Sequence, residues 1–178
     1  GFGIRCSDAV RKITSLDLQH NSCDVVLKEL PADEFDRVEH LQRGLHKHLA
    51  GAPVFFPGEN FEDWFKNWIK RENMRVFAAE TGGKIIGFIS IDDNAENFIT
   101  EHEKMKNICG AYFDESYRGI GIAQGLLGYI TEALKAEGIT HLGVDCETLN
   151  PTALNFWGKY FDAYTYSFAR RIDERIKL

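Results

Sequence analysis

Residues 112–123, Tyr-Phe-Asp-Glu-Ser-Tyr-Arg-Gly-Ile-Gly-Ile-Ala, have the types and spacing to bind an anion. An apolar, strand-like run precedes them and a helical pattern follows, so they predict a turn between a strand and a helix. The first amides of a helix lack acceptors within it and lie at the positive end of its dipole. Gly119 and Gly121 leave room for a phosphate beside those amides, and Arg118 adds a positive charge. An ordinary turn requires neither feature, so we predict a pyrophosphate-binding turn.

Two classes of cofactor site use such a turn. A dinucleotide site has the pattern GxGxxG, with an acidic residue about 20 positions further on, where Asp145 lies at a plausible distance. However, Gln124 stands at the third glycine, and a hairpin pattern upstream replaces the repeated strand-helix-strand units of that fold. The other pattern, (Gln/Arg)-x-x-Gly-x-(Gly/Ala), is met in full by Arg118, Gly121 and Ala123.

A second motif follows the next expected strand. Residues 150–159 read Asn-Pro-Thr-Ala-Leu-Asn-Phe-Trp-Gly-Lys, which is similar to the N-x-x-A-x-x-F-Y-x-K pattern of the GNAT acyltransferases. With both motifs in order, residues 74–172 resemble that family. The resemblance is specific for fold and cofactor, and it does not specify the acceptor substrate.

The resemblance implies a mixed α/β fold of the GNAT type. In this fold helices flank a mixed, mostly antiparallel sheet, and the fourth and fifth strands splay apart. The pantetheine arm of acetyl-CoA, the co-substrate, would lie in that gap. A primary amine of a small molecule would attack the thioester directly, without a metal, and a backbone amide near Phe113 would stabilise the oxyanion. The implied cofactor-binding residues are Phe113, Arg118, Gly119, Ile120, Gly121, Ile122, Ala123, Asn150, Ala153 and Trp157.

The groups that would move protons are less well defined. Trp157 stands where the family has its usual acid, a tyrosine, and an indole cannot protonate a departing thiolate. Nearby replacements are Tyr160 and Tyr164, followed by Tyr166. For the base we rank Glu147, at the end of a predicted strand, ahead of the other candidates, Asp145 and Glu103.

Two other functions stay open at this point. The departures from the family pattern fit a catalytically degenerate, acyl-CoA-binding regulatory half of a tandem GNAT protein. A dinucleotide-binding oxidoreductase ranks third. A thiol nucleophile at Cys109 or Cys146 is a poor alternative, because the sequence offers no well-placed histidine partner for either cysteine.

The expected elements position these motifs in one domain. Helices are predicted over residues 31–49, 61–68, 119–137 and 151–160, and strands over 24–30, 74–80, 84–91, 105–113, 140–147 and 163–172. We expect the aromatic stripe of residues 61–68 to be core, and residues 53–68 to form a wall of the acceptor pocket. Gly110, inside a strand, indicates a bulge or a close backbone approach.

Residues 1–20 do not fit this order, so we divide the chain into this extension and a GNAT domain over residues 21–178. Residues 1–13 align with residues 160–172 through three identities, among them Phe2 with Phe161. The extension could therefore be the last strand of a preceding, similar domain. We expect it to pair with a sheet edge in this chain or in a neighbour, and the second case would give a homodimer by strand exchange.

Composition limits the partners and the compartment. The formal charge of −6 and pI of about 5.5 disfavour nucleic acid and tolerate a cationic amine. No apolar run approaches the roughly 20 residues that span a membrane, and scattered cysteines without CxxC spacing indicate a cytoplasmic protein. We expect no metal site, because His40, His46 and His48 do not stack on one helical face.

Overall fold

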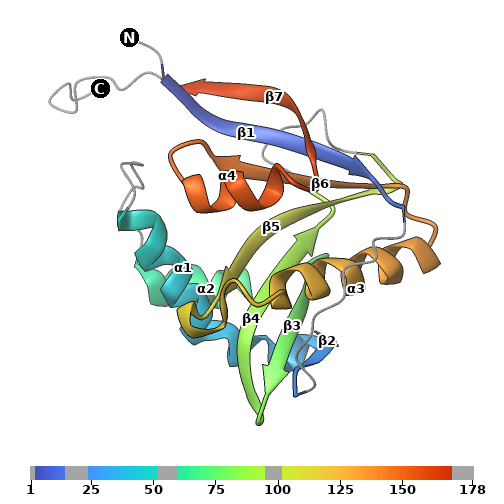
Figure 1. Cartoon of the computed structure of the whole chain (residues 1–178). Coiled ribbons are helices and arrows are strands. Elements are labelled where there is room, and N and C mark those ends of the chain that lie inside the picture. The colour runs from blue at the N-terminus through green and yellow to red at the C-terminus, as the bar shows by residue number, and fades with distance from the viewer. Residues whose placement is uncertain (1–2, 15–23, 52–59, 95–101, 170–178) are drawn as a thin grey trace, which may run out of the picture.

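A computed structural model describes residues 3–14, 24–51, 60–94 and 102–169 (Figure 1). Within them, seven strands form one sheet in the order β2-β3-β4-β5-β6-β1-β7, and all pairs are antiparallel except β5 with β6. The strands are β1 Gly3–Lys12, β2 Val26–Leu30, β3 Arg75–Thr81, β4 Lys84–Asp92, β5 Met105–Phe113, β6 His141–Glu147 and β7 Asp162–Ala169. The helices are α1 Glu39–Gly51, α2 Phe61–Trp68, α3 Ile122–Ala136 and α4 Pro151–Trp157.

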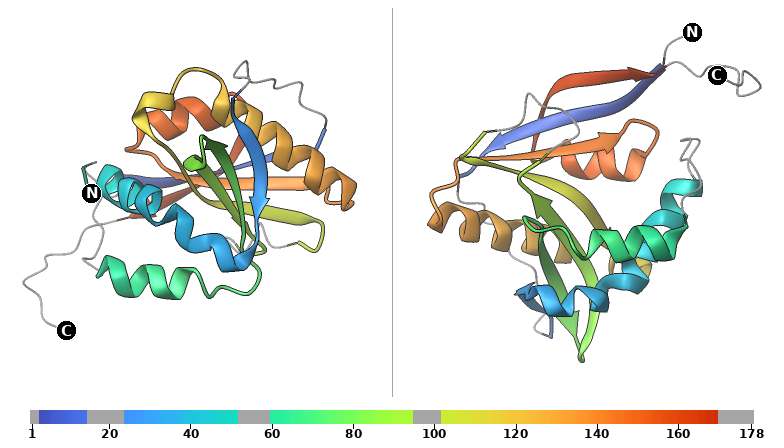
Figure 2. Two further views of the ribbon diagram at one scale, coloured as in Figure 1. Left: turned by 90° about the horizontal axis from the view of Figure 1, so that it is seen from below. Right: turned by 180° about the vertical axis from the view of Figure 1, so that it is seen from behind.

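Helices cover both faces of the sheet (Figure 2). Side chains alternate along β3, so that Phe77 packs in the cluster that includes α3 and α4, while Val76 and Ala78 pack in the cluster that includes α1 and α2. Phe65 and Trp68 of α2 are buried in the second cluster. The prediction that the aromatic stripe is core is therefore confirmed.

The segment after Pro31 differs from the single helix predicted over residues 31–49. It forms a 3₁₀ helix, Ala32–Val38, and α1 begins only at Glu39. The 3₁₀ segment places Phe35 and Val38 in the core. Local propensity does not show this change, because the apolar spacing suits either type of helix.

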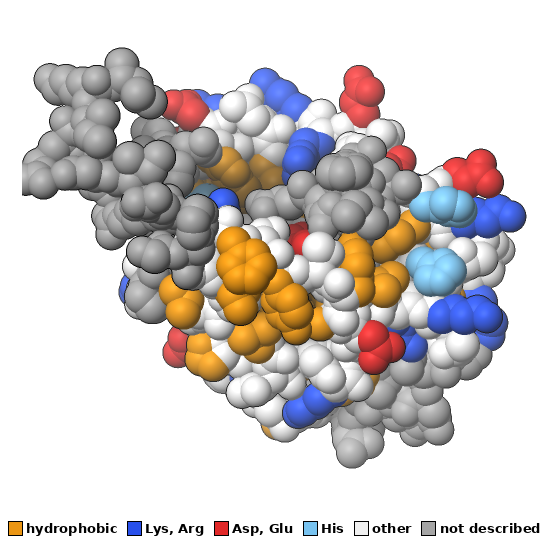
Figure 3. All heavy atoms as spheres, turned by 90° about the horizontal axis from the view of Figure 1, so that it is seen from above, with side chains coloured by type: hydrophobic (Ala, Val, Ile, Leu, Met, Phe, Trp, Pro, Cys, Tyr) orange, Lys and Arg blue, Asp and Glu red, His pale blue; other side chains and the backbone are white. Residues whose placement is uncertain are grey.

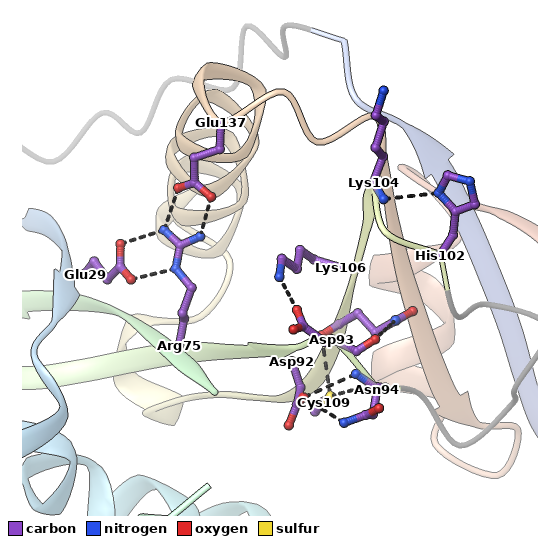
Figure 4. A network of polar contacts seen from close by, with 11 residues as sticks. Glu29, Arg75, Asp92, Asp93, Asn94, His102, Lys104, Lys106, Cys109 and Glu137 are labelled. Atoms are coloured by element: carbon purple, nitrogen blue, oxygen red, sulfur yellow. Dashed lines mark hydrogen bonds and ion pairs between the residues drawn. The ribbon is translucent and has the colours of Figure 1, made fainter. Parts of the chain in front are cut away.

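The hairpin between β3 and β4 follows its prediction. Gly82 and Gly83 have φ of 55° and 80°, a backbone region that favours glycine. Arg75, at the start of β3, binds Glu29 of β2 and Glu137 after α3 with two hydrogen bonds each (Figure 4). The hydrogen bonds to these carboxylates raise the pKa of Arg75. These contacts join the sheet to the C-terminal end of α3.

β1 is an interior strand of this chain's own sheet. It pairs with β6 over Cys6–Lys12 on one side and with β7 on the other. The prediction that this segment forms a strand and pairs is confirmed, whereas its expected position at a sheet edge is wrong. Ala9 lies between Val144 and Ala163 and is buried in the main core cluster. The sheet therefore depends on β1 to join β6 to β7.

The edge strand β7 carries an exposed apolar stripe. Tyr164, Tyr166 and Phe168 are exposed, as is Ile4 of β1, which pairs with Phe168. Hydrophobic side chains gather on the face of the molecule seen in Figure 3.

Among the described residues, no helix is long and apolar enough to cross a membrane.

The interior position of β1 predicts a large effect of a buried charge. Ala9→Asp would place a carboxylate in the core between two strands, and we expect it to lower the free energy of unfolding by about 3 kcal/mol or more. Lys12→Asp, on an exposed position of the same strand, is the matched control. Urea unfolding measures both variants. Equal stability of the two would contradict an interior β1.

Candidate functional site

The two parallel strands β5 and β6 separate halfway along. Their register runs through four pairs and ends at Ile108 with Val144. Both strands continue, β5 to Phe113 along β4 and β6 to Glu147 along β1. Among the described residues, no strand pairs with the facing edges of residues 109–113 and 145–147. The predicted splay is therefore present, and it leaves backbone donors and acceptors open to a ligand.

A bulge in β5 lies where the strands part. Ile108 pairs with Ile91 and Gly110 with Ser90, so Cys109 is an extra residue in the ladder. A Cβ at Gly110 would lie 3.0 Å from the Ser90 hydroxyl. The prediction that Gly110 marks a bulge or a close backbone approach is confirmed by the bulge beside it. A bulge bends the strand that contains it, and this one lies at the residue where β5 stops pairing with β6.

Polar contacts hold the start of β5 next to this bulge (Figure 4). Lys106 pairs with Asp93, and the Asn107 amide donates to the Asp93 carbonyl at 3.3 Å. The Cys109 thiol donates to the Asn94 carbonyl at 3.6 Å. These bonds tie β5 to Asp93 and Asn94, the two residues that follow β4.

The predicted anion-binding turn follows β5. The Asp114 carboxylate accepts hydrogen bonds from the amide and hydroxyl of Ser116, at 3.2 and 2.7 Å, and closes a short 3₁₀ turn. Gly119 and Gly121 have φ of 79° and 90°, so α3 begins at Ile122 and not at Gly119 as predicted. No side chain caps α3 at Gly121. Its first amides therefore remain available to an anion.

Arg118 has a structural role in this turn in addition to its charge. Its Nε donates to the Phe113 carbonyl at 2.9 Å, and its guanidinium lies 4.9 Å from the centre of the Tyr112 ring. The guanidinium also lies 3.8 Å from the Glu115 carboxylate. Arg118 thus ties the turn to the open end of β5.

Asn150 caps α4 on the opposite side of the gap. Its Oδ1 accepts the amide of Ala153 at 3.2 Å and lies 3.3 Å from Nε2 of His48 on α1. Asn150 is 8% exposed. Because the oxygen is occupied twice, the Asn150 side-chain NH₂ is the group left for a ligand carbonyl.

A cavity of about 730 Å³ joins the turn, α1 and the start of α4. Tyr112 at the end of β5 and Asn150 before α4 both line it, so the cavity lies at the mouth of the gap between β5 and β6. Its described lining is His40, Leu41, Gly44, Lys47, His48, Gly51, Tyr112, Asp114, Glu115, Leu149, Asn150, Pro151 and Thr152.

The predicted acid candidates lie elsewhere among the described residues. Tyr160 is half-buried, with its ring 5.4 Å from that of Phe156, and Tyr164 and Tyr166 are exposed on β7. None of them belongs to the described lining of the cavity. Trp157 is buried in the core cluster beside α3. Residues 53–59 of the expected pocket wall lie outside the described residues.

The predicted base candidates differ in their surroundings. Glu147 lies at the open end of β6, where its carboxylate is 3.4 Å from the Arg5 guanidinium of β1. Asp145 is half-buried on the same strand, and Glu103 is exposed before β5. Glu147 and Asp145 therefore share the open edge of β6, whereas Glu103 is at the paired end of the sheet.

The cysteine thiols are poor nucleophiles. Burial raises the pKa of Cys146 to about 11, and the neighbouring carboxylates Asp145 and Glu147 raise it further. Cys109 is exposed, and desolvation together with the Asp92 carboxylate shifts its thiol pKa upward. A raised thiol pKa keeps the sulfur protonated near pH 7, and the thiolate is the reactive form.

His48 is the site residue that sequence reasoning missed. The sequence analysis considered it only as a metal ligand together with His40 and His46. Its contact with Asn150 joins residues that are 102 positions apart, so it depends on how α1 lies over the sheet. The only local signal was a histidine on the predicted helix.

Comparison with known proteins identifies the family. A family model described as acetyltransferase (GNAT) family matches residues 39–162, which is more than half of the chain. The chain therefore belongs to the GNAT acetyltransferase family.

Individual relatives are distant. An uncharacterized N-acetyltransferase of Methanocaldococcus jannaschii is 26% identical over 156 residues, which cover 86% of this chain and 65% of that protein. A conserved protein of unknown function from Staphylococcus epidermidis matches with a TM-score of 0.66 at 14% identity, over 94% of this chain and 61% of that one. This chain thus spans less than two thirds of both proteins.

A structure with bound coenzyme A is also similar. PaiA N-acetyltransferase from Thermoplasma acidophilum, in complex with coenzyme A, has a TM-score of 0.59 at 17% identity. The match covers 76% of this chain and 87% of that one. At this identity the likeness shows the shared fold.

Proposed function

We propose that this protein transfers an acetyl group from acetyl-CoA to a primary amine of a small molecule. The observation that carries the proposal is the open gap between β5 and β6, with an uncapped helix N-terminus at one side and Asn150 at the other. An extended polar chain ending in a pyrophosphate fits this arrangement, because it can pair with the open backbone edge while its anion meets the amides.

Each part of acetyl-CoA has a proposed partner. The pyrophosphate would bind the amides between Gly119 and Ala123, with Arg118 adding charge. The pantetheine arm would pair with β5 near Phe113, whose ring occupies the space that a Cβ at Gly87 would fill. The Asn150 NH₂ would donate to a pantetheine carbonyl. The remaining proposed contacts are Ile120, Ile122, Ala153 and Trp157, of which Ile122 and Trp157 are buried and act by packing.

The proposed chemistry is direct attack of the amine nitrogen on the thioester carbon. Backbone amides at the open end of β5 would donate to the developing oxyanion. An acyl-enzyme is not required, and the raised thiol pKa values of Cys109 and Cys146 are consistent with that. Glu147 is the proposed base on the open edge of β6, and Tyr160 and Tyr164 are the proposed acids.

The cofactor claim predicts a charge effect at Ile120. This side chain is 53% exposed in the turn, so Ile120→Glu would place a carboxylate beside the pyrophosphate without strain on the backbone. A carboxylate near a helix N-terminus does not destabilise the helix. We expect the affinity for acetyl-CoA to fall at least tenfold, or about 1.4 kcal/mol, by calorimetric titration.

Ile120→Gln is the neutral control of the same length as glutamate, and it should bind acetyl-CoA more tightly than Ile120→Glu. Equal affinities of the two variants would contradict an anion site at this turn. Substitution of Gly121 is a weaker test, because any side chain at φ 90° strains the turn itself.

The proposed acid and base predict a loss of turnover without a loss of binding. Glu147→Gln, Tyr160→Phe and Tyr164→Phe should be compared by thiol release from acetyl-CoA with polyamines, amino acids and aminoglycosides as acceptors. We expect at least one variant to lower kcat by about 10²-fold or more at unchanged acetyl-CoA affinity. Full activity in all three would exclude these roles. Binding by the wild type without turnover on any acceptor would favour the degenerate regulatory half of a tandem protein.

A further inference from the structure

Helix α1 lies beside both the end of β5 and the start of α4. It lies against β5 at Gly44, where an added Cβ would meet the Tyr112 ring at 2.7 Å. His48 is one turn further along, on the same side of the helix, and its Nε2 lies 3.3 Å from Asn150 Oδ1. The imidazole therefore stands in the wall of the cavity, between the two sides of the gap.

The contacts of Asn150 determine the tautomer of His48. The backbone amide of Ala153 can only donate, so the Asn150 atom that it meets is the amide oxygen. That oxygen can only accept, so the proton in the contact with His48 belongs to Nε2. A neutral imidazole with its proton on Nε2 carries its lone pair on Nδ1. His48 is thus held with Nδ1 as its acceptor nitrogen, and this nitrogen has no hydrogen-bond partner among the described residues.

The other titratable groups that line the cavity either have hydrogen-bond or ion-pair partners or are exposed to solvent. Asp114 accepts from Ser116 and pairs with Lys84, and these hydrogen bonds lower the pKa of its carboxyl group. The other charged or ionisable residues of the described lining come from two sides. Helix α1 contributes His40 and Lys47, whereas β5 and the turn after it contribute Tyr112, Asp114 and Glu115. The described lining from the start of α4 is uncharged.

Three of these neighbours are less suited to act as a base. The Nε2 of His40 donates to the Ile85 carbonyl at 3.0 Å, so its Nδ1 is also an acceptor, but His40 is exposed to solvent, whereas His48 is half-buried. Glu115 is exposed beside Arg118, and Tyr112 lies under the same guanidinium. His48 is half-buried and retains an acceptor nitrogen, so it is the cavity group best suited to take a proton.

We propose that His48 is a catalytic residue that accepts a proton from the ammonium of the acceptor substrate. This inference rests on the proposed acetyl transfer, and it competes with the assignment of the base to Glu147 and of the acid to Tyr160 and Tyr164. The ammonium gives one proton to Nδ1, and the freed nitrogen lone pair forms the C–N bond to the thioester carbon. The C–S bond then breaks with its electron pair on sulfur. The imidazolium returns its proton to the thiolate, and the second nitrogen proton passes to water, leaving an amide and free coenzyme A.

His48→Gln separates this role from a structural one. The glutamine side chain has an NH₂ that can donate to Asn150, but it has no basic nitrogen. We expect kcat to fall about 100-fold, with the acetyl-CoA dissociation constant within twofold of the wild type by calorimetry. The acidic limb of the wild-type kcat/KM profile against pH should disappear. His141→Gln is the control, because His141 is exposed at the opposite, paired end of β6.

Nitrogen NMR of histidine-labelled protein gives a second readout that does not depend on turnover. The proposal requires the Nε2–H tautomer at His48, and an Nδ1–H tautomer would overturn it. A kcat within threefold of the wild type in His48→Gln, or a lower kcat with an unchanged pH profile, would also overturn it. If the wild type binds acetyl-CoA but acetylates no acceptor, the transfer reaction itself fails, and the His48 proposal fails with it.

Discussion

The site depends on the way β6 divides its hydrogen bonds between two neighbours. One edge of β6 is paired with β1 along all of His141–Glu147, whereas the other is paired with β5 only as far as Val144. A strand end with no partner on either side would not be held in place. Because β1 satisfies one edge fully, β6 can extend beyond β5 without fraying. The contact continues past the strand, where Thr148 donates to the Arg5 carbonyl at 2.8 Å.

The remaining parts of the site are arranged around this gap. The bulge at Cys109 lies directly after the last pair between β5 and β6, and Arg118 fixes the turn that precedes α3. Asn150 starts α4 directly after β6, and His48 reaches it from α1. The uncapped start of α3, the open edge of β5, the Asn150 amide and the His48 imidazole therefore surround one opening. The GNAT family assignment is consistent with this arrangement, and the acceptor amine is left to the biochemical tests.

Much of this arrangement could be predicted from local sequence patterns. The glycine pair and Arg118 predicted the turn, and the predicted bounds of β5 match the structure. The start of α3 was placed too early because the positive φ of Gly119 and Gly121 is a property of the folded turn and not of helical spacing. The interior place of β1 and the contact between His48 and Asn150 could not be predicted, since each joins residues more than 100 positions apart. Such contacts follow from how the elements pack, which no local pattern encodes.

The central claim is that acetyl-CoA occupies the gap between β5 and β6. A crystal structure of the protein with bound acetyl-CoA tests it most directly. We expect the pyrophosphate oxygens within about 3.2 Å of amides between Gly119 and Ala123, and the pantetheine paired with the β5 backbone near Phe113. The Asn150 NH₂ should face a pantetheine carbonyl. Acetyl-CoA bound away from this gap, with the open edges of β5 and β6 empty, would contradict the account.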